Sequence, residues 1–135
     1  MSNWTHAAGI IRIDFIRFEE FSKEEYLNDL HDIFGKEVTF ESSSELWNEA
    51  YEHPERFLPL SSEGSLEMDV WVNPNKSSIA ALTVSIFGDL RDHDSPDEIV
   101  EWFKDKCENS DLMIRNAVIT VRNEYNGTRT WTYDK

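Results

Sequence analysis

Hydrophobic and polar side chains alternate along five stretches of the chain, and this alternation predicts β-strands. The five stretches are residues 9–18, 65–73, 78–87, 113–125 and 128–133. In the second of them the apolar side chains face one way, while Trp71 and two carboxylates face the other. The third has small and aliphatic side chains on its apolar face, which is typical of a central strand. A further short strand is predicted at residues 36–41.

The last two stretches flank an Asn-Gly pair, which is the strongest short-range signal for a β-hairpin. Counting outward from a two-residue turn places Arg122 opposite Trp131, with Tyr133 on the same face. The same count predicts a cross-strand ion pair between Glu124 and Arg129. Because both pairs join compatible side chains, they favour this register.

Three segments repeat their apolar side chains with the 3.6-residue period of an α-helix. The first begins at a Ser-x-x-Glu capping box at Ser22 and ends before Gly35, a residue type typical of the position after a helix. A second capping box at Ser42 begins a helical insertion near residues 42–60, which two prolines interrupt. The third helix begins at Ser95, which is followed by a proline and two acidic residues.

The predicted order of elements is strand, helix, helical insertion, two strands, helix and two strands. Without the insertion this is the ferredoxin-like β-α-β-β-α-β order, with an added edge strand from the C-terminal hairpin. We expect a single acidic α+β domain over residues 1–135, with a mostly antiparallel sheet and two main helices on one face. Because this architecture hosts many unrelated functions, it predicts none of them.

Composition and charge exclude several classes of function. The 135 residues include 27 acidic and 13 basic side chains, a formal net charge of −14, and 39% are hydrophobic. Such a chain can build a packed core, and its charge repels free nucleic acid and anionic membranes. No apolar run reaches the roughly 20 residues that cross a bilayer, and no signal peptide is readable. Because Cys107 is the single cysteine, we expect a cytoplasmic protein without an internal disulfide.

The densest polar cluster lies between the third strand and the third helix. Asp89, Asp92, His93 and Asp94 could supply ligands to a divalent cation, or raise one another's pKa for acid catalysis. Their spacing matches no calcium loop, and a solvated loop before a helix N-terminus has the same composition, so we favour that interpretation. Zinc, nucleotide-loop and serine-nucleophile motifs are missing from the sequence, so we expect no cofactor and favour a protein without catalytic activity.

Acidic side chains concentrate in the first 110 residues, which carry 24 acidic and 9 basic side chains, whereas the last 25 carry three and four. Glu24 and Asp29 represent this charge on the first helix, and Glu45 and Glu49 on the insertion. Such an acidic face can attract a basic groove that normally holds nucleic acid. The alternative is a solvated face that only keeps the protein soluble.

The hairpin predicts a second surface. Arg122, Trp131 and Tyr133 share one face of it, and Trp71 lies on the polar face of its own strand. Trp, Tyr and Arg are typical of interface hot spots, so these four residues form a binding surface if the helices pack on the other side of the sheet. If the insertion covers this face instead, the same residues are buried.

We therefore hypothesise a small cytoplasmic protein-binding or regulatory protein that contacts neither nucleic acid nor membrane directly. Its sharper form is an acidic inhibitor of a basic nucleic-acid-handling protein, as an immunity protein, antitoxin or phage counter-defence factor is. One alternative is an enzyme or a ligand- or metal-binding domain with its site at residues 89–97. Another is a homo-oligomeric subunit whose final strand, residues 128–133, pairs with its copy in a dimer.

Overall fold

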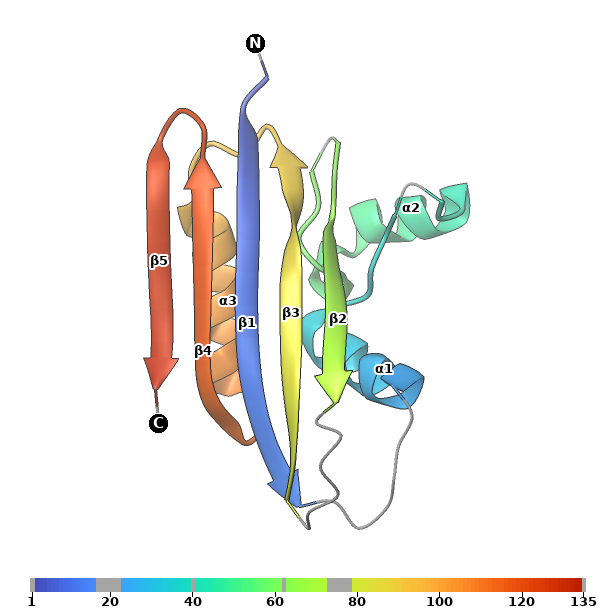
Figure 1. Ribbon diagram of the computed structural model, residues 1–135. Helices are drawn as coiled ribbons and strands as arrows, with labels where there is room; N and C mark the ends of the chain where they lie inside the picture. Colours follow the sequence, from blue (N-terminus) through green and yellow to red (C-terminus); the bar gives the residue numbers. More distant parts are fainter. Residues whose placement is uncertain (1, 17–22, 40, 62, 73–78, 135) are drawn as a thin grey trace.

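A five-stranded antiparallel sheet with three α-helices forms the architecture of the computed structural model (Figure 1). The residues that it describes are 2–16, 23–39, 41–61, 63–72 and 79–134. In chain order the elements are β1 (Trp4–Ile16), α1 (Lys23–Phe34), α2 (Ser44–Glu52), the 3-10 turn η1 (Pro54–Arg56), β2 (Leu66–Val72), β3 (Ile79–Arg91), α3 (Asp97–Asn109), β4 (Ile114–Asn123) and β5 (Gly127–Asp134). The predicted α+β class is confirmed.

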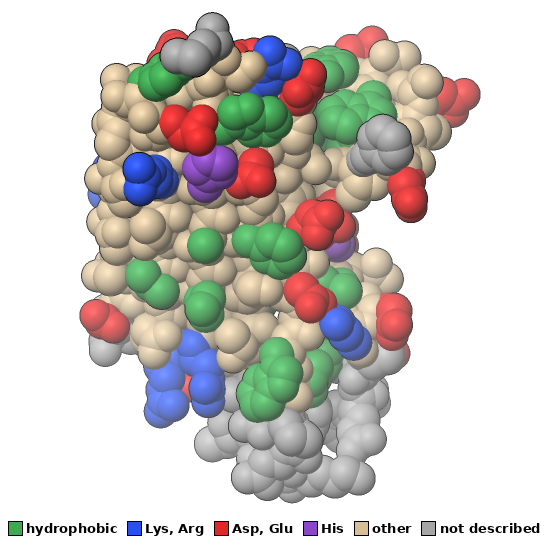
Figure 2. All heavy atoms as spheres, turned by 45° about the horizontal axis from the view of Figure 1, so that its top comes forward, with side chains coloured by type: hydrophobic (Ala, Val, Ile, Leu, Met, Phe, Trp, Pro, Cys, Tyr) green, Lys and Arg blue, Asp and Glu red, His purple; other side chains and the backbone are tan. Residues whose placement is uncertain are grey.

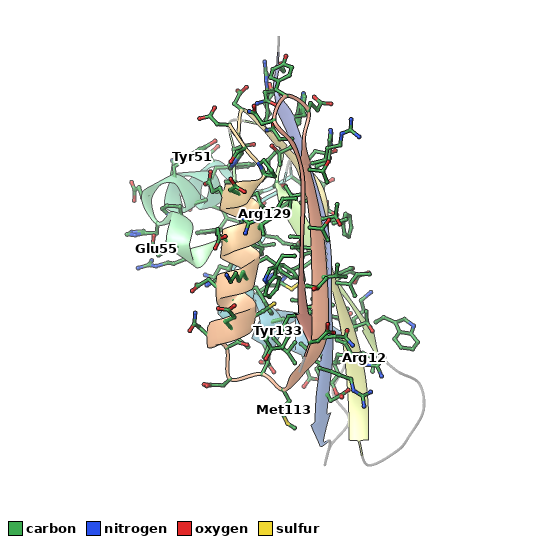
Figure 3. All side chains as sticks on the ribbon, turned by 90° about the vertical axis from the view of Figure 1, so that its left-hand side faces the viewer. Arg12, Tyr51, Glu55, Met113, Arg129 and Tyr133 are labelled. Carbon is green, nitrogen blue, oxygen red and sulfur yellow. The ribbon has the colours of Figure 1, made fainter. Side chains whose placement is uncertain are left out.

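The strands lie in the order β2-β3-β1-β4-β5, so β1 is central while β2 and β5 form the two edges. Figure 1 shows α3 behind β1 and β4, whereas α1 and α2 lie toward the β2 side. Figure 3 shows that the helices of the described residues lie on one face of the sheet and leave the opposite face without a helix from these residues. We call that opposite face the open face. No helix among the described residues is long and apolar enough to cross a membrane.

The hydrophobic core lies between the sheet and the helices. The periodicity of the helices is confirmed, because α1 buries Tyr26, Leu30 and Phe34, and α3 buries Ile99, Val100, Phe103 and Cys107. Burying each large apolar side chain stabilises the fold by about 1.5–3 kcal/mol. A smaller cluster of Val38, Ala50 and Phe57 holds α2 against the loop that follows it.

Strands β1 and β3 are longer than predicted. β1 begins five residues earlier, at Trp4, and β3 continues through Arg91 instead of ending at Phe87. The two extensions pair with each other, and Leu90 within them is fully buried. This pairing and burial stabilise the longer strands. Asp89 therefore belongs to a strand instead of a loop.

Two local predictions near α2 were wrong. Residues 36–41 form no strand among the described residues, and a single bridge joins Lys36 to Phe57. The N-cap of α2 is Ser43, whose Oγ accepts a hydrogen bond from the Leu46 N–H at 3.2 Å, instead of Ser42. The capping box predicted at Ser22 lies outside the described residues.

The hairpin loop is one residue longer than predicted, and the register of β5 against β4 differs from the prediction by three residues. β4 and β5 are joined by three residues, with Asn123 paired to Gly127. The Asn123 Oδ1 accepts the N–H groups of Tyr125 (3.1 Å) and Asn126 (2.9 Å), which shapes the turn. Gly127 has a positive φ of 94°, which suits the residue that closes a three-residue hairpin loop.

This shift moves every side chain of β5 to the other face of the sheet, because side chains alternate with a period of two. Trp131 lies opposite Ile119 instead of Arg122, so the predicted cation–π pair is wrong. Arg129 binds Asp97 and Glu101 of α3 at 3.0 and 2.8 Å, which also overturns its predicted ion pair with Glu124.

Asn123 also connects the hairpin to the rest of the fold. Its side chain is fully buried, and its Nδ2 donates to the Thr5 Oγ1 at 2.9 Å and to the His93 carbonyl oxygen at 2.8 Å. The same carbonyl accepts a hydrogen bond from Asn3 Nδ2 at 2.9 Å. One polar side chain thus joins β4 to β1 and to the segment before α3.

Candidate binding groove

A groove of about 840 Å³ lies between α2 and the start of β2. This volume falls within the range of roughly 300–1,000 Å³ that is typical of ligand sites. Figure 2 shows the hollow on the side of the molecule below α2, with acidic side chains along its rim. The residues that line it are Thr39, Glu41, Trp47, Tyr51, Glu63, Gly64, Ser65 and Glu67. We call this site the acidic groove.

One wall of the acidic groove is aromatic. Trp47 and Tyr51 stand one turn apart on α2, with ring centroids 5.9 Å apart and planes tilted by 32°. The Trp47 Nε1–H donates to the Thr39 carbonyl oxygen at 3.2 Å, which fixes the indole ring. Tyr51 is 60% exposed, so its ring faces solvent instead of the core. The Trp47 ring, by contrast, packs against the smaller core cluster.

The groove is also lined by carboxylates. Glu41, Glu63 and Glu67 line the groove, and none of the lining residues is basic. Glu63 is neutralised by Arg91, whose Nη1 lies 2.8 Å from the Glu63 Oε1. Glu41 and Glu67 form no ion pair with another described residue, so the groove keeps two uncompensated negative charges.

The loop that carries Glu63 is held by a close approach of two backbones. The Arg91 N–H donates to the Glu63 carbonyl oxygen at 3.0 Å. Gly64 has a φ of 87°, and a Cβ at this position would lie 2.0 Å from the Asp89 carbonyl oxygen. A Cβ at Gly88 would likewise lie 2.3 Å from the Ser65 carbonyl oxygen. The floor of the groove therefore requires glycine at both positions.

A second, shallower hollow of about 440 Å³ adjoins the groove at the open face. The two hollows share Gly64, Ser65 and Glu67, and the second continues to Trp4, Phe87, Gly88 and Asp89. A polymer that lies in the acidic groove can thus continue around the end of β2 onto the open face. Asp89 adds another carboxylate along this path.

His6 of β1 connects β3 and the β4–β5 loop beside this second hollow. Its Nδ1 lies 2.6 Å from the Asp89 Oδ1, and its Nε2 lies 3.2 Å from the Glu124 Oε2. The hydrogen bond with Asp89, and then that with Glu124, raises the pKa of His6 above its usual value of 6.5. Because both ring nitrogens donate only in the charged imidazole, this arrangement favours protonated His6.

The four residues of the predicted aromatic surface do not come together. Trp71 is 56% exposed on the open face, beside the exposed Glu67 and Asp69 of the same strand. Arg122 is exposed on β4. Trp131 instead contacts Phe103 of α3 edge-on, with centroids 5.9 Å apart, and Tyr133 stacks beside it. Figure 3 shows Arg129 and Tyr133 on the helix side of the sheet, and Arg12 on the opposite side.

The predicted acidic residues lie on two neighbouring helices. Glu24 and Asp29 are exposed on α1, and Glu45 is exposed on α2. Glu49 is half-buried, with its Oε1 4.0 Å from the Arg56 Nη1. None of these four lines the acidic groove, whose carboxylates come from the segments before α2 and around the start of β2.

The residues proposed from sequence as metal ligands point to different partners. Asp89 binds His6, while the buried His93 has its Nδ1 3.1 Å from the Glu98 Oε2 and its Nε2 3.1 Å from the Leu60 carbonyl oxygen. Asp92 and Asp94 are exposed. Within the described ranges, no three His, Cys, Asp or Glu side chains are arranged to hold a metal ion.

Comparison of the chain with protein-family models, with curated proteins and with solved structures gave no match. The geometry of the acidic groove is therefore the basis for a functional conclusion. A groove lined by aromatic rings and by carboxylates is suited to a cationic group, because the face of an aromatic ring attracts positive charge and a carboxylate accepts its hydrogen bonds.

Proposed function

We propose that this chain is a small cytoplasmic protein-binding protein without catalytic activity, and that its acidic groove receives a basic segment of a partner protein. The observation that carries the proposal is that two aromatic rings, Trp47 and Tyr51, line the same groove as the carboxylates of Glu41 and Glu67. A net charge of −14 supports it, because long-range attraction accelerates encounter with a basic surface.

Arginine suits this groove better than lysine does. The guanidinium group is planar, so it can stack on the Trp47 or Tyr51 ring while its N–H groups bind a carboxylate in two places. An ammonium group can approach a ring or a carboxylate, but it offers no flat face for stacking. The preferred partner therefore presents arginine side chains in an extended segment.

In its sharper form the protein inhibits a nucleic-acid-handling protein. Arginine-rich surfaces on such proteins contact phosphate groups, and an acidic protein competes for the same side chains. The second hollow supports this form, since it extends the line of carboxylates from Glu67 to Asp89. A partner segment that occupies this path can place several of its arginines against carboxylates at once.

For the architecture we propose the ferredoxin-like arrangement with one added edge strand. Its support is that β1 lies between β3 and β4, and that the chain passes through helices between β1 and β2 and again between β3 and β4. β5 then extends the sheet beyond β4. The α2 segment is an insertion in this arrangement, and it supplies the aromatic wall of the groove.

The direct test measures binding of fluorescein-labelled octa-arginine by fluorescence anisotropy between 50 and 500 mM NaCl. We expect affinity to fall steeply with salt, because half-exposed charge pairs are screened. The double variant Glu41→Gln/Glu67→Gln should lose about tenfold in affinity at low salt, since two such pairs together contribute about 1.4 kcal/mol. Octa-lysine should bind more weakly than octa-arginine.

The matched control is Glu24→Gln/Asp29→Asn, which removes two exposed charges from α1 outside the groove. It should lose no more than about twofold in affinity, because it changes only the long-range field. An equal loss in both double variants would show that overall charge, and not the groove, attracts the peptide. Salt-insensitive binding, or no binding, would overturn the proposal.

The inhibitor form needs a second experiment. Tagged protein is incubated with a lysate of the source cells at low salt, and partners released by a salt step are identified by mass spectrometry. The same capture is repeated with excess duplex DNA or RNA. A basic partner that nucleic acid displaces supports the inhibitor form, and a partner retained in its presence contradicts it.

A further inference from the structure

We infer that two copies of this chain associate through β5, so that their sheets join edge to edge across a two-fold axis. The inference is independent of the acidic groove, which lies at the opposite edge of the sheet. It rests on a difference between the two edges, on the half-buried aromatic side chains of β5 and on the distribution of charge. In Figure 1, β5 forms the outer edge beside β4.

The β2 edge is covered by the protein's own side chains and backbone. The Met68 N–H donates to the Glu37 carboxylate, which occupies a position that a neighbouring strand would need. Leu60 forms an antiparallel bridge with Ser65 at the start of the strand. Further along, the Lys23 Nζ of α1 lies 2.8 Å from the Asp69 Oδ1. Side chains and loops that cover an edge strand in this way prevent the strand of another chain from pairing with it.

The β5 edge has none of this cover among the described residues. It is eight residues long, contains no proline, and pairs only with β4. Thr128, Thr130 and Thr132 are exposed along its open-face side, and threonine is compatible with a paired strand. An uncovered edge of this length presents a row of backbone donors and acceptors to another strand.

The side chains on the helix side of β5 are incompletely buried. Trp131 contacts Phe103 with one edge and stacks on Tyr133 at 6.1 Å, yet both rings keep part of their surface in solvent. An axis at or beside Trp131 brings the same two rings of the second copy against them. Arg129 then lies near Tyr133 of the second copy, and Asp97 and Glu101 already neutralise its charge.

Two copies repel each other less at the β5 edge than at the acidic helices near β2. The last 25 residues carry four basic and three acidic side chains, whereas the first 110 carry 9 and 24. The strands β4 and β5 themselves therefore carry little net charge. Helix α3 behind them adds five acidic and two basic side chains, and Arg129 binds two of those acids, Asp97 and Glu101. The acidic helices near β2 lie several strand spacings away, beyond the screening length of about 8 Å at physiological salt.

The geometry limits assembly to two copies. A two-fold axis uses the same edge of both chains, and the remaining edges of the joined sheet are both β2, which is covered. Helices of both copies lie on the same face, so the two acidic grooves lie at the outer ends of a ten-stranded sheet. Nine spacings of about 4.8 Å separate the two β2 strands by about 43 Å.

Sedimentation velocity and light scattering on the full chain from 1 to 200 µM test the inference. We expect the mass to rise with concentration from 15.8 kDa to twice that value. The variant Thr130→Lys/Thr132→Lys should stay monomeric, because any axis at or beside Trp131 places its lysines opposite one another. Circular dichroism confirms that each variant is folded.

The matched control is Asn116→Lys/Thr120→Lys, which adds the same charge to exposed positions one strand inward. Both variants remove the Thr120–Thr130 hydroxyl hydrogen bond of 3.1 Å, so they differ only in distance from the edge. The control should dimerise like the wild type. A wild type that stays monomeric overturns the inference, and so does a dimer that the β5 variant leaves intact.

Cysteine cross-linking locates the axis. Thr130→Cys and Thr132→Cys, alone and mixed, should give a disulfide-linked dimer in one combination, since cross-strand Cα atoms lie about 4.5–5.5 Å apart. The native Cys107 is buried and gives no background. Asn116→Cys is the negative control. If no combination cross-links while a dimer forms, the dimer uses another surface and the inference fails.

Discussion

The close approach of Gly64 to β3 gives a sharp prediction about the floor of the acidic groove. Gly64→Ala adds one methyl group at a residue with φ 87° and places it 2.0 Å from the Asp89 carbonyl oxygen. Gly127→Ala is the matched control, because Gly127 has a similar φ of 94° but no atom within 4 Å of its added Cβ. Both variants impose left-handed backbone strain, and only the first imposes a collision.

The size of the effect follows from these distances. Ordinary contact of a Cβ begins at 3.4 Å, so the two backbones must separate by about 1.4 Å in Gly64→Ala. That movement breaks the 3.0 Å hydrogen bond from the Arg91 N–H to the Glu63 carbonyl oxygen and the 2.8 Å ion pair of the same residues. The strain costs about 1 kcal/mol in either variant, and the two lost contacts add about 2 kcal/mol.

Urea unfolding at pH 7 should therefore show a loss of about 1 kcal/mol for Gly127→Ala and about 3 kcal/mol for Gly64→Ala. The corresponding falls in melting temperature are about 3 and 9 °C for a domain of this size. Gly64→Ala should also weaken binding of octa-arginine, whereas Gly127→Ala should not. Equal losses of stability in the two variants would refute the close approach at Gly64.

Three further predictions concern side chains outside the groove. Hydrogen bonds to Asp89 and Glu124 raise the pKa of His6, so the stabilisation by His6 is complete below the unfolded pKa of about 6.5 and is lost as pH rises through the folded pKa. Between pH 6 and 9, the melting temperature of the wild type should therefore fall relative to that of His6→Gln. Burial, and then Glu108, raises the pKa of Cys107 to about 12, so a disulfide reagent at pH 8 should label it only after unfolding. Asn123→Ala should lower the free energy of unfolding by about 3 kcal/mol in urea, because it removes four hydrogen bonds.

Elements with strong local signals were predictable from the sequence. The alternation in β2 and the buried stripe of α3 are both confirmed, because each depends on residues close together in the chain. The periodicity of α1 is confirmed in the same way, with Tyr26, Leu30 and Phe34 buried. Hydrophobic burial at short range is thus enough to fix these elements.

The hairpin register was not predictable from the Asn-Gly pair alone. A two-residue turn places both Asn126 and Gly127 in the loop. Instead, the side chain of Asn123 accepts the N–H of Asn126, the loop contains residues 124–126, and Gly127 pairs with Asn123. Asn123 is polar, so its pattern favours an outward position, yet it is fully buried by its bonds to Thr5 and His93. The available signal was an asparagine three residues before the turn asparagine, which is typical of side-chain-capped turns.

The acidic groove depends on contacts between distant segments. Glu41, Tyr51 and Glu67 lie on three separate parts of the chain, and each alone has the pattern of an ordinary solvent-exposed residue. Gly64 and Gly88 could be recognised as turn residues, but their close approaches to the backbones of Asp89 and Ser65 follow from the extension of β3 beyond Phe87. Partners separated by more than 20 residues leave no periodic signal in the sequence.

The central position of β1 governs when the sheet can form during synthesis. β1 precedes all other elements in the chain, yet its two neighbours are β3 and β4, which end at Arg91 and Asn123. A ribosome adding about 5–20 residues per second leaves this 13-residue strand without either neighbour for several seconds. During that interval the exposed aliphatic edge of β1 is available to chaperones and to other nascent chains, so the yield of folded protein depends on translation speed across the middle of the message.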